Sequence, residues 1–312
     1  DSVALRRSIR PLIESGAEVK LGINGNVEGE FDLAVVSPGV SLDQPLVEDL
    51  RAKQVPVIGE LELGWRYSLC PNIAITGTNG KTTTTELVAA LLNYGQHRTL
   101  AAGNIGVPVC SVACRTRELD ILTLEVSSFQ LEAIDRFRPS IAVLTNLTPD
   151  HLDRHHSMGE YIQAKSRIFN NQHAFDWAIV QEEALMQMTK LGISLKSKVV
   201  TFSAHSETAD LFLDRSLIVS KMPGWSGLLL NLEDYMVHGV HNVQNLMAAF
   251  AVGRVMGLGL KEMREALLSY KPRPHRCEFI AERNDVDDDL MTLLYCTAPP
   301  AFSIKLLTDF VT

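Results

Sequence analysis

Residues 74–83 read AITGTNGKTT, and they join an apolar strand pattern to the start of an amphipathic helix. The helical pattern rests on four apolar residues at i, i+3 and i+4 spacing, Leu87, Val88, Leu91 and Leu92. Backbone N–H groups in a glycine-rich turn, together with a helix N-terminus, form a cradle for phosphate oxygens. The stretch therefore predicts a nucleotide-binding loop, in which Lys81 reaches the β- and γ-phosphates and the Thr82 hydroxyl binds Mg²⁺.

Strand and helix patterns alternate on both sides of this loop. Before it, we expect a helix at residues 45–53 and strands at 17–21, 33–36 and 55–58. After it, we expect helices at 82–94, 159–169 and 242–256, strands at 73–76, 121–125, 141–145 and 177–180, and shorter strand-like pieces within 199–232. This alternation predicts an α/β fold with a mainly parallel sheet that has helices on its faces.

The length of 312 residues allows about two domains. Pro272 and Pro274 mark a boundary, because two prolines so close together cannot both lie inside a helix. A Rossmann-like unit normally opens with a strand and a glycine-rich turn, which the first residues do not provide. We therefore expect a partial N-terminal domain at 1–68, a complete central domain at 69–272, and at 273–312 a short remnant of a further domain with an unrelated tail.

Composition argues against several classes of protein. The formal net charge of -8 disfavours nucleic acid or an anionic membrane as the main partner. No apolar run approaches the roughly 20 residues that span a bilayer, and there is no signal-peptide pattern. The five cysteines form no CxxC pair, so we expect reduced thiols rather than a disulfide framework. The expected location is the cytoplasm.

Two further strand ends carry polar side chains. Glu125 ends the strand pattern at 121–125, where a parallel sheet presents its ligand crevice, although a surface acid fits the residues equally well. Residues 144–156, LTNLTPDHLDRHH, also follow a strand. Their histidines and aspartates do not have the spacing of a structural zinc site.

Lys165 falls within the apolar stripe of the helix at 159–169. Either its stem covers apolar surface while the ammonium reaches water, or the amine is buried with a lowered pKa and can react with CO₂ to form a carbamate. Asn242 and Asn245 lie three residues apart and so share one face of the last helix. That arrangement fits a helix cap with a surface amide as well as a ligand contact.

Residues 76–83, TGTNGKTT, resemble the nucleotide loop of the Mur ligase and folylpolyglutamate synthetase superfamily. A general P-loop has a glycine where this chain has Ile75, and the superfamily loop lacks that glycine too. Residues 127–132, SSFQLE, resemble the type that adds D-glutamate, and residues 161–168, YIQAKSRI, match its motif Tyr-x-x-x-Lys-x-Arg-Ile. The similarity extends from about residue 9 to residue 282.

The resemblance implies an ATP-dependent amide ligase of peptidoglycan precursor synthesis. In that family ATP phosphorylates a carboxylate, and an amine then displaces phosphate from the acyl phosphate. The implied substrates are UDP-N-acetylmuramoyl-L-alanine and D-glutamate, and the products include ADP and phosphate. Because two anions meet in the first step, Mg²⁺ and fixed cations must neutralise them. Nothing in the chain requires more than a monomer.

The resemblance also implies roles for individual residues. It assigns ATP binding to Gly77, Thr78, Asn79, Gly80, Lys81, Thr82, Thr83, Asn242, Asn245 and Arg276. It assigns two Mg²⁺ sites to Thr82, Glu125, His151 and a carbamylated Lys165, with His155 and His156 left in solvent. It assigns catalysis to Lys81, His151 and Lys165. It assigns substrate contacts, including those to the UDP group, to Ser37, Pro38, Gly39, Asn104 and Ser127.

The chain departs from the family pattern after Ile280. There the family has an Asn-Asp-Ser-Lys motif and a third domain that closes over ATP, whereas this chain has Asn284 and Asp285 without the lysine. We expect the acidic run at 285–289 to be solvated. Two alternatives therefore stay open: a ligase of the same superfamily with another acceptor, and a nucleotide-binding fragment without catalysis.

Overall fold

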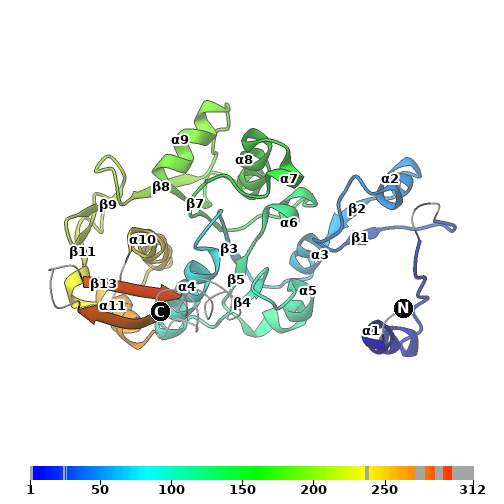
Figure 1. Cartoon of the computed structure of the whole chain (residues 1–312), viewed down its shortest axis with the longest axis horizontal. Coiled ribbons are helices and arrows are strands. Elements are labelled where there is room, and N and C mark those ends of the chain that lie inside the picture. Colours follow the sequence, from blue (N-terminus) through cyan, green and yellow to red (C-terminus); the bar gives the residue numbers. More distant parts are fainter. Residues whose placement is uncertain are drawn as a thin grey trace.

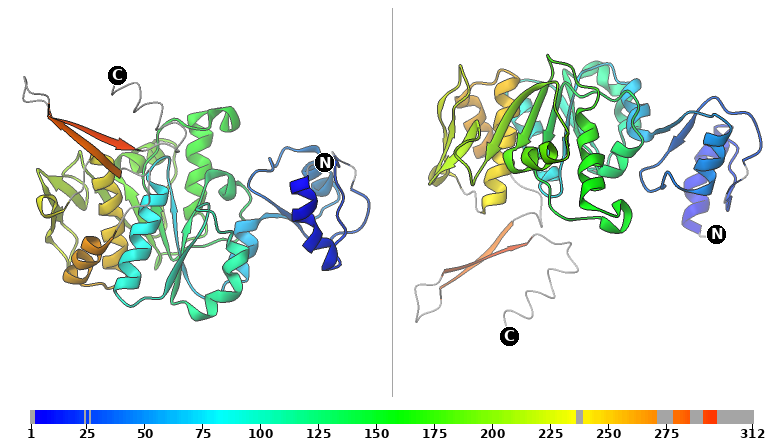
Figure 2. Two further views of the ribbon diagram at one scale, coloured as in Figure 1. Left: turned by 60° about the horizontal axis from the view of Figure 1, so that its bottom comes forward. Right: turned by 90° about the horizontal axis from the view of Figure 1, so that it is seen from above.

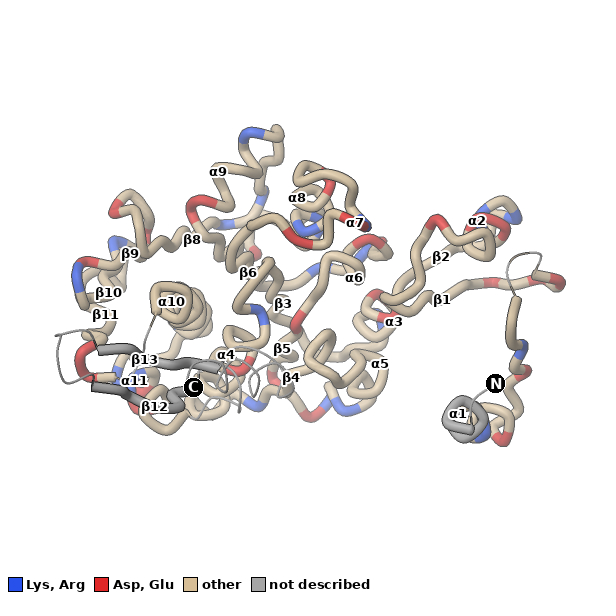
Figure 3. Tube along the Cα trace, viewed as in Figure 1, with Lys and Arg blue, Asp and Glu red and all other residues tan. Residues whose placement is uncertain are grey.

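The computed structural model describes the backbone of residues 3–23, 25, 27–235, 239–270, 278–284 and 291–296, and side chains within 9–270 of that set. The predictions for Pro272, Pro274, Arg276 and residues 285–289 lie outside these residues. Basic and acidic positions are interspersed along the described part of the trace (Figure 3). No helix in the described ranges is long and apolar enough to cross a membrane.

The N-terminal segment contains two helices and a two-stranded parallel sheet, and it is coloured blue in Figures 1 and 2. Its elements are α1 (Val3–Glu14), β1 (Ala34–Val36), α2 (Pro45–Ala52) and β2 (Val57–Gly59). The predicted strand at 17–21 is wrong: these residues are almost all exposed and pair with neither strand. The sequence pattern also misses α1, because Pro11 lies inside it and an interior proline normally ends a helix.

The rest of the chain is built on a nine-stranded sheet with the order β11-β10-β9-β8-β7-β6-β3-β5-β4. The strands from β4 to β9 pair in parallel, and β10 and β11 add an antiparallel edge. Their bounds are β3 (Asn72–Thr76), β4 (Thr99–Gly103), β5 (Ile121–Glu125), β6 (Ile141–Leu144), β7 (Trp177–Gln181), β8 (Lys198–Ser203), β9 (Leu211–Asp214), β10 (Leu217–Ser220) and β11 (Gly227–Asn231). The predicted mainly parallel sheet is confirmed, although the sequence pattern does not identify β4.

Helices cover both faces of this sheet (Figures 1 and 2). One face is covered by α4 (Lys81–Tyr94), α10 (Val240–Val255) and α11 (Leu260–Ser269). On the other side lie α3 (Glu60–Arg66), α5 (Val109–Val112), η1 (Ala113–Glu118), α6 (Ser128–Glu132), α7 (Leu152–His155), α8 (Met158–Ser166), η2 (Arg167–Phe169) and α9 (Glu182–Lys190), with η3 (Leu232–Asp234) after β11. Ile73 and Ile75 of β3 enter the first core and Ala74 enters the second, since neighbouring strand residues point to opposite faces.

The last described elements are β12 (Glu278–Asn284) and β13 (Met291–Cys296), which pair in antiparallel fashion. Cys70, Cys110 and Cys114, the cysteines whose side chains are described, are free thiols.

Candidate nucleotide and metal site

The loop between β3 and α4 has a backbone that two of its glycines make possible. Gly80 has φ 80° and caps α4, and only glycine adopts this left-handed conformation without strain. Gly77 has φ 150°, and a Cβ added there would lie 1.9 Å from Thr145 Oγ1. The predicted phosphate loop therefore joins a strand to a helix N-terminus, as its sequence requires.

Residues that follow β6 hold this loop in place. The N–H of Thr78 donates to the carbonyl of Asn146 (3.0 Å), and the N–H of Asn79 donates to Asn146 Oδ1 (2.9 Å). The hydroxyl of Thr145 donates to the carbonyl of Asn79 (2.7 Å). The sequence motifs did not predict that Thr145 or Asn146 belongs to the site. Their signal was the polar pair at the end of the strand pattern at 141–145.

Thr82, Glu125 and Asn104 come together beside the loop. The Thr82 hydroxyl donates to one carboxylate oxygen of Glu125 (2.7 Å), and the Asn104 amide donates to the other (2.7 Å). Glu125 is 2% exposed, and its side-chain partners within the described residues are these two neutral groups. A buried carboxylate next to a hydroxyl is the oxygen-rich environment that Mg²⁺ prefers.

Two lysines point at the loop from different helices. Lys81 Nζ donates to the carbonyls of Gly77 (3.0 Å) and Thr78 (2.7 Å). Lys165 Nζ also donates to the Gly77 carbonyl (2.7 Å), although Lys165 is only 1% exposed. Burial, and after it the charge of Lys81, lower the pKa of Lys165 from 10.5 to about 7, while Asp150 acts in the opposite direction. Of the two sequence interpretations, the structure supports the buried amine.

Tyr161 connects Lys165 to the loop. Lys165 Nζ lies 4.6 Å from the centre of the Tyr161 ring, on its face. The Tyr161 hydroxyl donates to Thr78 Oγ1 (3.2 Å), and Thr78 Oγ1 donates in turn to the carbonyl of Thr148 (3.0 Å). The helix α8 therefore contributes an aromatic support as well as an amine.

The histidines after β6 occupy different environments. The His151 side chain is half exposed, with Nε2 3.5 Å from a carboxylate oxygen of Asp150 and its ring 5.0 Å from that of Phe129. Neither of these contacts is with Thr82, Glu125 or Lys165. His155 is only 4% exposed, so the prediction that it is solvated is wrong, whereas His156 is exposed as expected.

His155 is buried because it is packed between aromatic rings and polar groups. Its ring lies 5.5 Å from Phe129 and 5.2 Å from Tyr161. Its Nε2 is 3.0 Å from the hydroxyl of Ser128. Burial is the main reason why the pKa of His155 is lowered.

The first turns of α10 approach the phosphate loop. Asn245 is 4% exposed, and a Cβ added at Gly80 would lie 2.1 Å from its Oδ1. Asn242 lies one turn earlier and is partly exposed. The structure therefore brings Asn245 against the loop.

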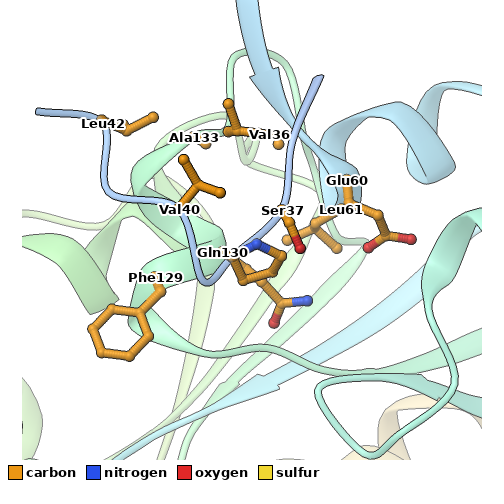
Figure 4. Close-up of a pocket in the computed structure, with 11 residues that line it drawn as sticks. Val36, Ser37, Val40, Leu42, Glu60, Leu61, Phe129, Gln130 and Ala133 are labelled. Atoms are coloured by element: carbon orange, nitrogen blue, oxygen red, sulfur yellow. The ribbon is translucent and has the colours of Figure 1, made fainter. Parts of the chain in front are cut away.

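The turn at residues 37–39 lies at a small pocket between the N-terminal segment and α6 (Figure 4). The pocket holds about 10 Å³, room for about one water molecule. It is lined by Val36, Ser37, Pro38, Val40, Leu42, Gly59, Glu60, Leu61, Phe129, Gln130 and Ala133. Ser127 lies beside it as the N-cap of α6, where its hydroxyl oxygen accepts the N–H of Gln130 (3.2 Å).

Within the described ranges, no group of three His, Cys, Asp or Glu side chains is arranged to hold a metal. A metal beside the loop would therefore rely on oxygen donors of mixed type, such as the Thr82 hydroxyl and the Glu125 carboxylate.

Solved structures with the same architecture include several ligases. A UDP-N-acetylmuramoyl-L-alanyl-D-glutamate–2,6-diaminopimelate ligase aligns with a TM-score of 0.58 at 24% identity, covering 88% of this chain and 66% of that one. MurF from Acinetobacter baumannii aligns with a TM-score of 0.56 at 22% identity, covering 78% and 54% of the two chains. At these identities the likeness establishes the fold alone.

Sequence relatives are more similar. The UDP-N-acetylmuramoylalanine–D-glutamate ligase of Koribacter versatilis is 40% identical over 287 residues, which cover 91% of this chain and 63% of that protein. The ligase of the same name from Clostridioides difficile is 37% identical over 284 residues, covering 90% and 62%. This chain thus spans about three fifths of the length of these relatives.

A family model described as "Mur ligase middle domain" matches residues 75–253, more than half of the chain. That range contains the phosphate loop, Glu125, Lys165 and Asn245, which the fold brings to one edge of the large sheet. The chain belongs to the Mur ligase family.

Proposed function

We propose that this chain is an ATP-dependent ligase that joins the carboxylate of UDP-N-acetylmuramoyl-L-alanine to the amino group of D-glutamate. ATP would phosphorylate the carboxylate, and the amine would displace phosphate from the acyl phosphate, which leaves an amide, ADP and phosphate. The names of the relatives support this substrate pair. The observation that carries the proposal is the buried Glu125 carboxylate bonded to Thr82 beside the phosphate loop.

The proposal divides the chain into three parts. Residues 1–68 would bind the UDP end of the substrate, residues 69–272 would bind ATP, and residues 273–312 would belong to a further unit. The protein would act as a monomer in the cytoplasm. Its formal net charge of -8 agrees with substrates bound at one local site rather than along a nucleic acid.

The nucleotide would lie along the loop and the start of α10. Backbone N–H groups at 80–83, at the N-terminus of α4, would bind the phosphates. Lys81 would exchange its present carbonyl partners for phosphate oxygens. Asn242 and Asn245 would contact adenine and ribose, and the family resemblance adds Arg276.

Thr82 and Glu125 would hold the first Mg²⁺. Both present oxygen, and Glu125 has a buried negative charge that its neutral partners Thr82 and Asn104 only solvate. Bound Mg²⁺ supplies charge neutralisation where phosphate and carboxylate meet. If the Glu125 carboxylate held a metal, the amide of Asn104 would be available to contact the muramoyl substrate.

Lys165 would carry a carbamate. The ammonium first loses a proton to solvent, and the neutral nitrogen then forms a bond to the carbon of CO₂ and releases a second proton to solvent. A cation would thus be replaced by a carboxylate able to bind a second metal. The lowered pKa, about 7, supplies neutral amine near physiological pH. His151 is the proposed protein partner at that site on resemblance alone, since its ring packs on Phe129 in this structure.

Contacts to the muramoyl nucleotide would come from residues 37–39, Asn104 and Ser127. The turn and Ser127 line or adjoin one pocket, which supports a shared ligand. The pocket holds about 10 Å³ and cannot enclose a sugar ring, so these residues would contact the ligand from the rim of the pocket.

The test is phosphate release from Mg-ATP in the presence of UDP-N-acetylmuramoyl-L-alanine, with and without D-glutamate. Release that needs both substrates would support the proposal. Release with a different acceptor would favour another ligase of the superfamily. A chain that binds Mg-ATP by calorimetry and releases no phosphate with any acceptor would be a nucleotide-binding unit instead.

A further inference from the structure

Arg154 lies between the turn at 37–39 and α6, and none of the roles above uses it. Its guanidinium donates to the carbonyl of Pro38 (3.4 Å) and to the carboxylate of Glu132 (2.8 Å). It also covers the ring of Phe129, 4.2 Å from the ring centre. Phe129 and Pro38 both line the small pocket of Figure 4, so one side chain contacts both walls of that pocket.

The helix α7, which carries Arg154, has a tightly defined backbone. It is four residues long and is bracketed by His151 and His156, whose φ angles of 50° and 57° lie in the left-handed region. Non-glycine residues adopt that region at a cost that the surrounding contacts must offset. His155 supplies such a contact, since its buried ring meets Ser128 and Tyr161. Arg154 is therefore presented from a fixed position.

The neighbourhood of Arg154 favours positioning over direct ligand binding. Its charge is paired with Glu132, and its side chain is only 21% exposed. The planar guanidinium satisfies the carboxylate, the carbonyl and the ring face at once, which a lysine ammonium cannot do. The N-terminal segment makes a second contact with the same region through the N–H of Gly59 and the carbonyl of Ala133 (2.8 Å). That contact fixes β2, whereas Arg154 fixes the turn.

We infer that Arg154 is a positioning residue that holds the turn at 37–39 in the geometry that receives the muramoyl nucleotide. This inference rests on the proposed function for the identity of the ligand. The contact it assigns to Arg154 is a property of the protein alone. Loss of Arg154 should therefore loosen the turn even when no ligand is bound.

The experiment compares Arg154→Ala, Arg154→Lys and a matched control, Arg138→Ala. Arg138 also pairs with a carboxylate, Asp176 (2.9 Å), and covers a ring, Phe175 (4.8 Å), but it precedes β6 at the opposite edge of the sheet. Two properties are measured on the full chain: backbone amide exchange at residues 34–42, and the calorimetric Kd of UDP-N-acetylmuramoyl-L-alanine and of Mg-ATP.

For Arg154→Ala we expect exchange at 34–42 to accelerate about tenfold and the muramoyl Kd to rise by a similar factor, with the Kd of Mg-ATP changed less than about twofold. Arg154→Lys should give an intermediate effect. Arg138→Ala should leave both the exchange at 34–42 and the muramoyl Kd unchanged. Unchanged exchange in Arg154→Ala, or equal effects from Arg138→Ala, overturns the inference. If the wild-type chain does not bind the muramoyl nucleotide, the proposed function fails, and exchange still decides the role of Arg154.

Discussion

Among single residues, the buried amine of Lys165 links folding to pH. Its pKa is about 7 in the folded chain and about 10.5 when unfolded. Between these values the unfolded chain binds more protons, so the free energy of unfolding rises with pH from about 7 to 10. The full pKa difference corresponds to roughly 3 to 5 kcal/mol. Below pH 7 the buried amine is protonated, and the free energy of unfolding is lower by this amount.

Replacing Lys165 by Met isolates this effect, because methionine fills the apolar stripe without titrating. We expect Lys165→Met to remove most of the rise in stability between pH 7 and 10, as measured by urea unfolding in CO₂-depleted buffer. Equal pH profiles for the two proteins would contradict the lowered pKa. In CO₂-rich buffer, native mass spectrometry should find an added 44 Da on the wild type only, which is the mass of one CO₂ in the carbamate.

Lys81 provides a second test at this scale. In Lys81→Ala the phosphates lose a cation that emerges directly from the loop, so we expect the calorimetric Kd of Mg-ATP to rise at least tenfold, about 1.4 kcal/mol. Lys198→Ala is the control, since Lys198 lies over the ring of Trp177 (5.0 Å) at the start of β8. Unchanged affinity in Lys81→Ala would remove the loop from the nucleotide site.

Lys165 and His155 show how far the burial of a side chain can be predicted from the sequence. Lys165 was placed in an apolar stripe by helical spacing alone, and it is buried there. His155 looked like part of a polar, solvated run, yet its ring is enclosed by Phe129 and Tyr161. Spacing reveals the burial of a residue on a regular helix. It does not reveal that of a residue on a four-residue helix whose neighbours come from elsewhere in the chain.

At the scale of elements, the loop between β3 and α4 depends on Gly80 for two separable reasons. Its φ of 80° is strained for other residues, and its missing side chain leaves room for Asn245. Gly192 has a similar φ of 76° but nothing within 4 Å, so it carries only the first reason. Alanine at either position should cost about 1 kcal/mol from backbone strain.

Gly80→Ala should lose more than Gly192→Ala, because it also displaces the buried Asn245. We expect a further loss of about 1 to 2 kcal/mol in urea unfolding, typical of a disturbed buried polar group. We also expect weaker Mg-ATP binding in Gly80→Ala alone. Equal losses in the two variants would mean that Asn245 yields without cost, and would weaken its assignment to the nucleotide site.

The elements were predictable where one strand or helix carries its own pattern. The strands β3, β5 and β6 are continuous apolar runs because helices cover both of their faces. The sequence pattern does not predict the strand β4, because three of its five residues are alanine or glycine, which contribute little to an apolar pattern. Residues 17–21 have the apolar content of a strand but no partner, and a strand exists only as part of a sheet. Thr145 and Asn146 hold the phosphate loop because two loops lie against each other, and no local sequence pattern predicts that arrangement.

At the scale of the whole molecule, a small two-stranded sheet is attached to a large one. The strand β1 has only three residues paired to β2, and Leu33 and Val35 remain about 40% exposed. By contrast, Ile73 and Ile75 of β3 are fully buried. Besides the contacts at Pro38 and Gly59, the attachment uses contacts at α3, the element that follows β2.

Glu62 of α3 makes one group of these contacts. Its carboxylate is fully buried and accepts the N–H groups of Asp135 (3.0 Å), Arg136 (3.1 Å) and Phe137 (2.8 Å), which follow α6. It also pairs with Arg66 (2.7 Å), one turn along the same helix. One side chain thus satisfies three backbone donors and a guanidinium at the junction between the N-terminal segment and the central sheet.

Glu62→Gln should therefore weaken the junction far more than the small change in side-chain size suggests. Glutamine offers one acceptor oxygen in place of two and leaves Arg66 beside a neutral amide, so we expect a loss of about 3 kcal/mol in urea unfolding. Asp120→Asn is the matched control, because Asp120 pairs with Arg98 (3.0 Å) at the exposed surface, where solvent screens the attraction. If Glu62 joins the two parts, amide exchange in Glu62→Gln should accelerate at residues 57–66 and 133–137 before the strands β3 and β5 are affected. A loss no larger than that of Asp120→Asn, or exchange that accelerates equally in β3, would show that the attachment lies elsewhere.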